Sequence, residues 1–180
     1  MEIGPGTGFD IWTVPLENDG AGLKTAGKPE VFLHEAFDER YPAFSPDGRW
    51  LAYSSNEQGA FQVYVRAFPD KGGRWPISNN GGLYPEWSRN GHELFFRTED
   101  NQLMAASYTV KGDTFVADKP RVWTPKRLGS LGLTPNFDLA PDGRSVAELV
   151  PADEEGEQKA QTHVIFLQNF FDEARRRAGK

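Results

Sequence analysis

The residues with the most evident chemistry lie in one stretch, LHEAFDERYP, at positions 33–42. This stretch contains His34, Glu35, Asp38, Glu39 and Arg40. Imidazole and carboxylate groups bind zinc, and carboxylates bind calcium, so the histidine and the three acids are candidate metal ligands. The chain has neither an HExxH sequence nor a three-histidine spacing. That favours the alternative, a polar loop held by ordinary salt bridges.

Two further carboxylates, Glu86 and Asp138, share equivalent places in a repeated sequence pattern, as do the tyrosines Tyr41 and Tyr84. Carboxylates that lie close together raise one another's pKa or recruit a cation. We expect these four residues, with Arg40, to contact a ligand. The alternative is that the two acids are solvated strand residues.

The candidates for catalysis are His34, His163, Glu86 and Asp138. A histidine that acts as a general base needs a carboxylate to orient it, and sequence does not supply that geometry. His163 and the two acids also extend the set of candidate metal ligands. No GxSxG motif occurs, and the serines of the repeat fall in turns, so a serine triad is not indicated.

The repeat itself is centred on the turn sequences SPDG (45–48), SRNG (88–91) and APDG (140–143), which begin 43 and then 52 residues apart. Each turn is preceded by a large apolar residue, and the third residue after its glycine is also apolar. An Asp-Gly or Asn-Gly pair between apolar runs predicts a hairpin with a two-residue type I′ turn. Each unit therefore opens with two antiparallel strands.

A third strand is expected after each hairpin, at 61–68, 102–110 and 162–170, and a short fourth strand at 74–78 and 121–125. Four strands in about 43 residues are the size of a propeller blade. Segments 9–16 and 29–34 match a third and a fourth strand. The sequence thus predicts an all-β propeller of about three blades, in a single domain over 1–180. Its parts are outer strands of a partial blade (1–34), blades at 41–78, 84–125 and 136–170, and a C-terminal tail or short helix (169–180).

Composition narrows the class of protein. The 180 residues include 20 basic and 26 acidic residues, for a formal net charge of -6, which argues against a nucleic-acid partner. There is no cysteine, and no stretch approaches the roughly 18 apolar residues of a membrane span, so no membrane partner is expected. The N-terminus lacks a signal-peptide pattern, so the chain as written is expected to be cytoplasmic.

The runs YPAFSPDGRWLAYSS, YPEWSRNGHELFF and FDLAPDGRSVAEL resemble the repeats of TolB-like, WD-type six-bladed β-propellers. The runs FQVYVRAFPDKGGRWPIS and HVIFLQNFFDEARRR are similar to the C-terminal sensor propellers of bacterial serine/threonine protein kinases. The resemblance implies a six-bladed ring, in domains that are often extracytoplasmic. No kinase motif is present, so kinase activity is not implied.

Half a propeller leaves two apolar faces uncovered, and exposing several large side chains there costs as much as the stability of a small domain. We therefore expect a homodimer in which two half-propellers form one ring, and the strands at 9–16 and 29–34 complete the last blade of the partner. The alternatives are a fragment of a longer propeller protein and an open, aggregating piece.

Three functions remain open from the sequence. The first is a sensor-like binding module for a small molecule or a peptide, which the resemblance favours. The second is a hydrolase of esters or phosphoesters, similar to phosphotriesterase and lactonase propellers, with a divalent metal, Zn or Ca, at the mouth of the channel. The third is a purely structural remnant that reassembles a propeller.

Overall fold

The computed structural model describes residues 2–3, 8–89, 92–129, 135–141 and 143–150. The chain divides into two compact units, 1–150 and 151–180, and the second lies outside the described residues. So do the predicted third strand at 162–170, His163 and the predicted C-terminal helix. Every regular element in the described part is a β-strand, and that part has no helix that could cross a membrane.

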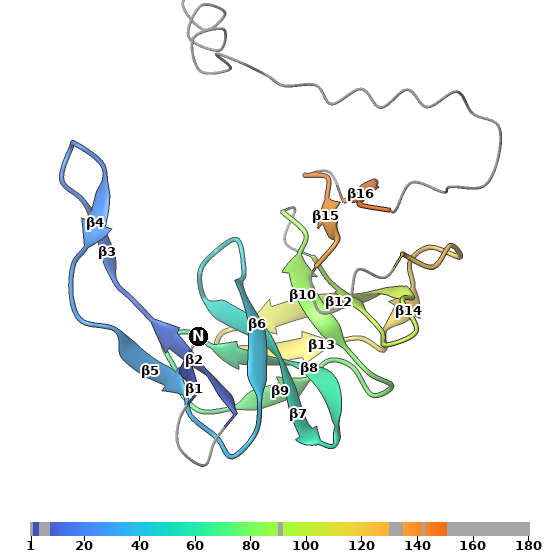
Figure 1. The fold of residues 1–180 in the computed structure, drawn as a ribbon, viewed down its shortest axis with the longest axis horizontal. Helices are drawn as coiled ribbons and strands as arrows, with labels where there is room; N and C mark the ends of the chain where they lie inside the picture. Colours follow the sequence, from blue (N-terminus) through green and yellow to red (C-terminus); the bar gives the residue numbers. More distant parts are fainter. Residues whose placement is uncertain (1, 4–7, 90–91, 130–134, 142, 151–180) are drawn as a thin grey trace, which may run out of the picture. The chain divides into compact units, whose positions relative to one another are not determined.

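The first blade is a four-stranded antiparallel sheet (Figure 1). Its strands, in order across the sheet, are β6 (Glu39–Phe44), β7 (Trp50–Gln58), β8 (Ala60–Ala67) and β9 (Arg74–Pro76). Of the two long central strands, β8 is rich in aromatic and β-branched residues, which favour strands, and β7 contributes Trp50 and Tyr53. They are joined at Gly59, whose φ of 91° suits the tight turn.

The second blade repeats this arrangement with β10 (Leu83–Trp87), β11 (Glu93–Arg97), β12 (Leu103–Lys111) and β14 (Arg121–Val122). One element differs from the sequence prediction. The distal half of β12 turns back at Gly112 and pairs with an additional strand, β13 (Thr114–Ala117). The insertion that lengthens this unit thus forms a hairpin extension of the blade.

The remaining strands form three small sheets. The partial N-terminal blade contains β1 (Glu2–Ile3), β2 (Phe9–Thr13) and β5 (Glu30–Leu33), in that order. Between its strands the chain forms a separate exposed hairpin, β3 (Leu16–Asn18) and β4 (Leu23–Thr25), which the sequence analysis did not predict. The third blade is represented by β15 (Phe137–Leu139) and β16 (Val146–Glu148).

The repeated turns connect the first two strands of a blade, as predicted, but the first is not the predicted type I′ turn. In the first, Ser45 N donates to Trp50 O at 2.9 Å and Gly48 N to Ser45 O at 2.9 Å, which leaves four residues in the loop. Gly48 has a positive φ of 70°, whereas Asp47 does not. Asp47 instead accepts hydrogen bonds from Ser45 Oγ and Arg49 N, so its side chain holds the turn.

The sheets stack face to face through apolar layers. The layer between the first and second blades is built around Trp50, Val63, Val65, Phe96 and Phe115. A second layer joins the partial N-terminal blade to the first blade, and a third joins the second blade to β15 and β16. Trp50, Trp75 and Trp87 lie in or against the first of these layers and Trp123 lies against the third, as expected for tryptophans that pack between blades. The fold is all-β and propeller-like.

Candidate functional site

The first strands of the two blades begin with the same distortion. Tyr41 and Tyr84 have positive φ angles of 57° and 54°, and the pairing register shifts at each of them. A bulge of this kind redirects side chains, and a positive φ is costly for a large residue unless its surroundings fix it. Both bulges therefore turn a tyrosine toward the neighbouring blade.

The two tyrosine rings meet, with centroids 4.3 Å apart and planes tilted by 50°. The guanidinium of Arg97 lies over the Tyr84 ring, 4.6 Å from its centroid. Burial, together with the adjacent Tyr41 hydroxyl, raises the pKa of Tyr84 to about 12. Tyr84 is therefore a neutral phenol across the physiological pH range.

The two predicted acids also come together. The Glu86 carboxylate accepts a hydrogen bond from Leu139 N at 3.1 Å, which ties β10 to β15. Burial raises the pKa of Glu86, and the adjacent Asp138 carboxyl raises it further. Asp138 is exposed and pairs in register with Ala147. Two carboxyls in contact favour a shared proton or a bound cation over two free charges.

These four residues line one hollow of about 420 Å3, which we call the mouth hollow. Its remaining lining residues are apolar: Pro42, Pro85, Pro135 and Phe137. The two tyrosines and the two acids come from three successive units of the repeat. They lie together, as expected for residues at equivalent places in the inner strands. An open site with aromatic, proline and carboxylate walls is suited to a small ligand or a single peptide side chain.

Arg97, which lies over the Tyr84 ring, also makes a polar contact that was not predicted from the sequence. Asn136 stands at the place that Tyr41 and Tyr84 hold in the other units, and it is buried. It accepts a hydrogen bond from Arg97 Nη1 at 3.0 Å and donates to Gly129 O at 2.8 Å. The alignment of the three turns singles out Asn136, but no local signal marks Arg97 as its partner.

Arg40, the fifth expected ligand contact, is not among the residues that line the mouth hollow. Its guanidinium lies 4.2 Å from the Phe9 ring centroid, and its Nη2 is 2.6 Å from Asp38 Oδ2. Arg40 thus connects the first blade to the partial N-terminal blade. In the structure it packs between these two blades, against Phe9 and Asp38.

The charged and histidine side chains of the 33–42 stretch pair with different residues and do not gather at one site. His34 Nδ1 lies 3.0 Å from Asp10 Oδ2, and Glu35 lies 3.5 Å from Arg66. Among the residues that the structure describes, no three His, Asp or Glu side chains gather closely enough to hold a metal ion. The metal-site interpretation therefore gains nothing from this stretch, and His163 lies outside the described residues.

Glu39 is the unusual group of this stretch because it is almost completely buried. It accepts a hydrogen bond from Ser55 Oγ at 3.3 Å. Burial raises the pKa of Glu39 to about 7, and the nearby Glu35 and Asp10 add to the increase. A carboxyl in this state is neutral in mildly acidic solution and becomes charged within the protein as the pH rises above 7.

No family model matches the chain, and no curated protein matches it. Similar solved structures include a putative TolB from Agrobacterium tumefaciens, with a TM-score of 0.41 and 18% identity, over 54% of this chain and 39% of that one. TolB from Acinetobacter baumannii gives a TM-score of 0.46 and 18% identity, over 74% of this chain and 32% of that one. This chain thus spans well under half the length of either protein. The similarity to kinase-attached sensor propellers stays a prediction.

The buried carboxyl predicts a specific dependence of stability on pH. The pKa of Glu39 is raised in the folded state, so the folded protein holds this proton more tightly than the unfolded chain, and stability falls as the pH rises from about 5 to 8. Glu39→Gln should flatten this fall and raise the free energy of unfolding at pH 8 by about 2–3 kcal/mol. Urea denaturation at both pH values measures the effect. Exposed Glu99→Gln is the control, and an unchanged pH profile for Glu39→Gln would contradict the assignment.

Proposed function

We propose that this protein is a propeller-type binding module that holds a small molecule or a peptide side chain in the mouth hollow. One observation carries the proposal: Tyr41, Tyr84, Glu86 and Asp138, contributed by three different units of the repeat, line the same hollow. Two of these residues adopt positive φ angles to reach it. Backbone strain that recurs at equivalent positions is typical of functional sites.

The chemistry of the walls favours a ligand that carries a cationic nitrogen group. Paired carboxyls attract an ammonium or guanidinium group, and tyrosine and phenylalanine ring faces add cation–π attraction. The proline rings and Phe137 supply apolar contact for the attached carbon chain. A lysine or arginine side chain presented by a peptide has this combination of charge and apolar stem.

The hydrolase interpretation lacks comparable support. His34 pairs with Asp10, and it is not one of the residues that line the mouth hollow. The hollow has two carboxyls and two phenols but no described histidine. We therefore do not propose a catalytic role for Glu86 or Asp138.

Binding can be tested with two neutral-capped amino acids of similar size, acetyl-arginine amide and acetyl-glutamine amide. Acetyl-arginine amide should shift the NMR signals of Tyr84 and Glu86, and the effect should weaken as salt is added. It should also strengthen with rising pH, because the raised pKa of Glu86 keeps this carboxyl protonated to a higher pH than an ordinary glutamate, and the cation is attracted to its ionised form. Acetyl-glutamine amide should cause no comparable shift.

Glu86→Gln should lower the affinity for acetyl-arginine amide about tenfold, since it removes one charged partner. The matched control is Asp113→Asn, an exposed carboxylate that pairs with Lys71 and is not among the residues that line the hollow. Equal responses to the two probes, or equal affinities in the two variants, would contradict the proposed site.

We also propose that two copies close one ring, as the sequence analysis expects from the blade count. Exposed apolar side chains at both ends of the described arc support this assembly: Trp12, Val14 and Val31 on the partial N-terminal blade, and Leu149 and Val150 after β16. Light scattering at micromolar concentration should give twice the mass of one chain. A monomer at that concentration would contradict the assembly.

A further inference from the structure

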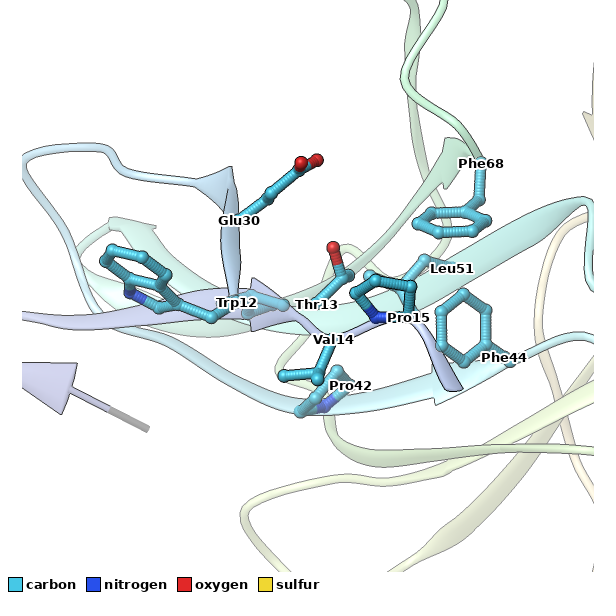
Figure 2. Close-up of a pocket in the computed structure, with 10 residues that line it drawn as sticks. Trp12, Thr13, Val14, Pro15, Glu30, Pro42, Phe44, Leu51 and Phe68 are labelled. Carbon is cyan, nitrogen blue, oxygen red and sulfur yellow. The ribbon is translucent and has the colours of Figure 1, made fainter. Parts of the chain in front are cut away.

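An apolar groove of about 480 Å3 lies between the partial N-terminal blade and the inner strands of the first blade. Figure 2 shows the rings of Phe44 and Phe68 gathered about Leu51 and Pro15. Phe44 is 51% exposed, which is unusual for a large aromatic residue between two stacked sheets. We call this hollow the interblade groove.

The next layer of the same molecule shows what normally fills such a space. Ile11 in β2 corresponds to Val63 in β8, and Leu51 in β7 corresponds to Leu94 in β11. Between Val63 and Leu94, the layer is filled by Trp50 and Ala52 of the second strand of the first blade. The interblade groove is therefore the place of the second strand of the partial N-terminal blade.

The backbone supports the same conclusion. On the side of β2 where a second strand belongs, β1 pairs only with Phe9 and Asp10. Beyond Asp10, this edge of β2 has no neighbouring strand among the described residues. An uncovered strand edge beside an apolar groove is a template for the addition of a strand.

We infer that β16 of a second copy adds to this edge of β2 and covers the interblade groove. This inference rests on the proposed ring closure and specifies its contacts. Among the described residues β16 pairs with β15 alone, and residues 162–170, where the sequence predicts the third strand of this blade, lie outside them. In each copy, β2 is the third strand of a blade and has no second strand beside it among the described residues. Likewise β16 is the second strand of a blade and has no third strand beside it among those residues.

The repeat fixes the register of this pairing. Ala147 pairs with Asp138 as Ala52 pairs with Ala43, so Ala147 is the counterpart of Ala52. Ala52 in turn pairs with Val65, whose counterpart in β2 is Thr13. Ala147 of the partner subunit should therefore lie opposite Thr13.

In the same register, the exposed Leu149, which follows β16, would become buried. Leu149, which is 67% exposed, is the counterpart of Ser54 and would lie opposite Ile11, on the groove side of the strand. Ser145 is the counterpart of Trp50, which fills the layer between the first and second blades. The equivalent part of the interblade groove would therefore receive only the small side chain of Ser145. The joint is therefore complementary in register but incompletely packed.

The register can be tested by disulfide cross-linking, since the chain has no cysteine of its own. Full-length Thr13→Cys and Ala147→Cys are prepared separately, mixed and oxidised. Residues directly opposite in an antiparallel pair are close enough for a disulfide, so a covalent dimer should form in the mixture and far less in either variant alone. Trp12→Cys mixed with Ala147→Cys is the control, because its side chain lies on the opposite face of the sheet.

A gain of affinity tests the groove itself. Ser145→Trp restores the residue that fills the equivalent space in the next layer, and it should lower the dissociation constant of the dimer about tenfold or more in sedimentation experiments. Adding Thr13→Lys, which puts a charge at the edge of the groove, should abolish that gain. A Ser145→Trp variant that dimerises no better than the wild type would overturn the filling of the groove.

The outcomes separate this inference from the assembly on which it rests. A wild-type dimer that fails to cross-link through Thr13 and Ala147 overturns the strand pairing and leaves ring closure intact. A monomer overturns both. Failure of the mixture to cross-link is also the result expected if residues 162–170 of the same chain hold this edge of β16, and that too would overturn the inference.

Discussion

The arrangement depends on the packing of Trp50 between the first two blades. Its ring meets Trp75 edge-on at 5.3 Å and Phe115 at 5.1 Å, and it is 1% exposed. Aromatic pairs of this kind add directional attraction to the hydrophobic effect. A hydrogen bond from Trp87 Nε1 to Ala43 O, 2.9 Å long, joins the inner strands of the same two blades. Together these contacts set the distance and the angle between the sheets.

Stacking of this kind makes the mouth hollow possible. The inner strands of successive blades can meet only if their sheets pack face to face, and only then do Tyr41 and Tyr84 come into contact. The central strands accordingly bury both faces, with Trp50 and Ala52 in one layer and Leu51 and Tyr53 in the next. The site thus depends on the apolar layers more than on any one loop. A mutation in a layer should therefore disturb the mouth hollow even where the mutated residue does not line it.

Much of this architecture could be predicted from the sequence, because it follows from the spacing of the repeated turns and of the apolar residues. Three similar turns at blade-sized intervals predict the hairpins, and the alternation of apolar residues predicts the strands that follow. The same alignment places Tyr41 beside Tyr84 and Glu86 beside Asp138. What could not be predicted depends on contacts between distant residues: the β13 extension, the burial of Glu39 and the pairing of Arg97 with Asn136. The positive φ angles of the tyrosines belong to the same group, since tyrosine has no local preference for them.

The central claim is that equivalent residues of successive units meet at the mouth of a stacked set of blades. The most direct measurement is the nuclear Overhauser effect between the rings of Tyr41 and Tyr84, in protein whose only proton-bearing aromatic side chains are tyrosines. Ring centroids 4.3 Å apart predict a strong cross-peak between the two rings, which disappears in Tyr41→Leu. A wild-type spectrum with assigned tyrosine signals and no such cross-peak would show that the units do not stack as described.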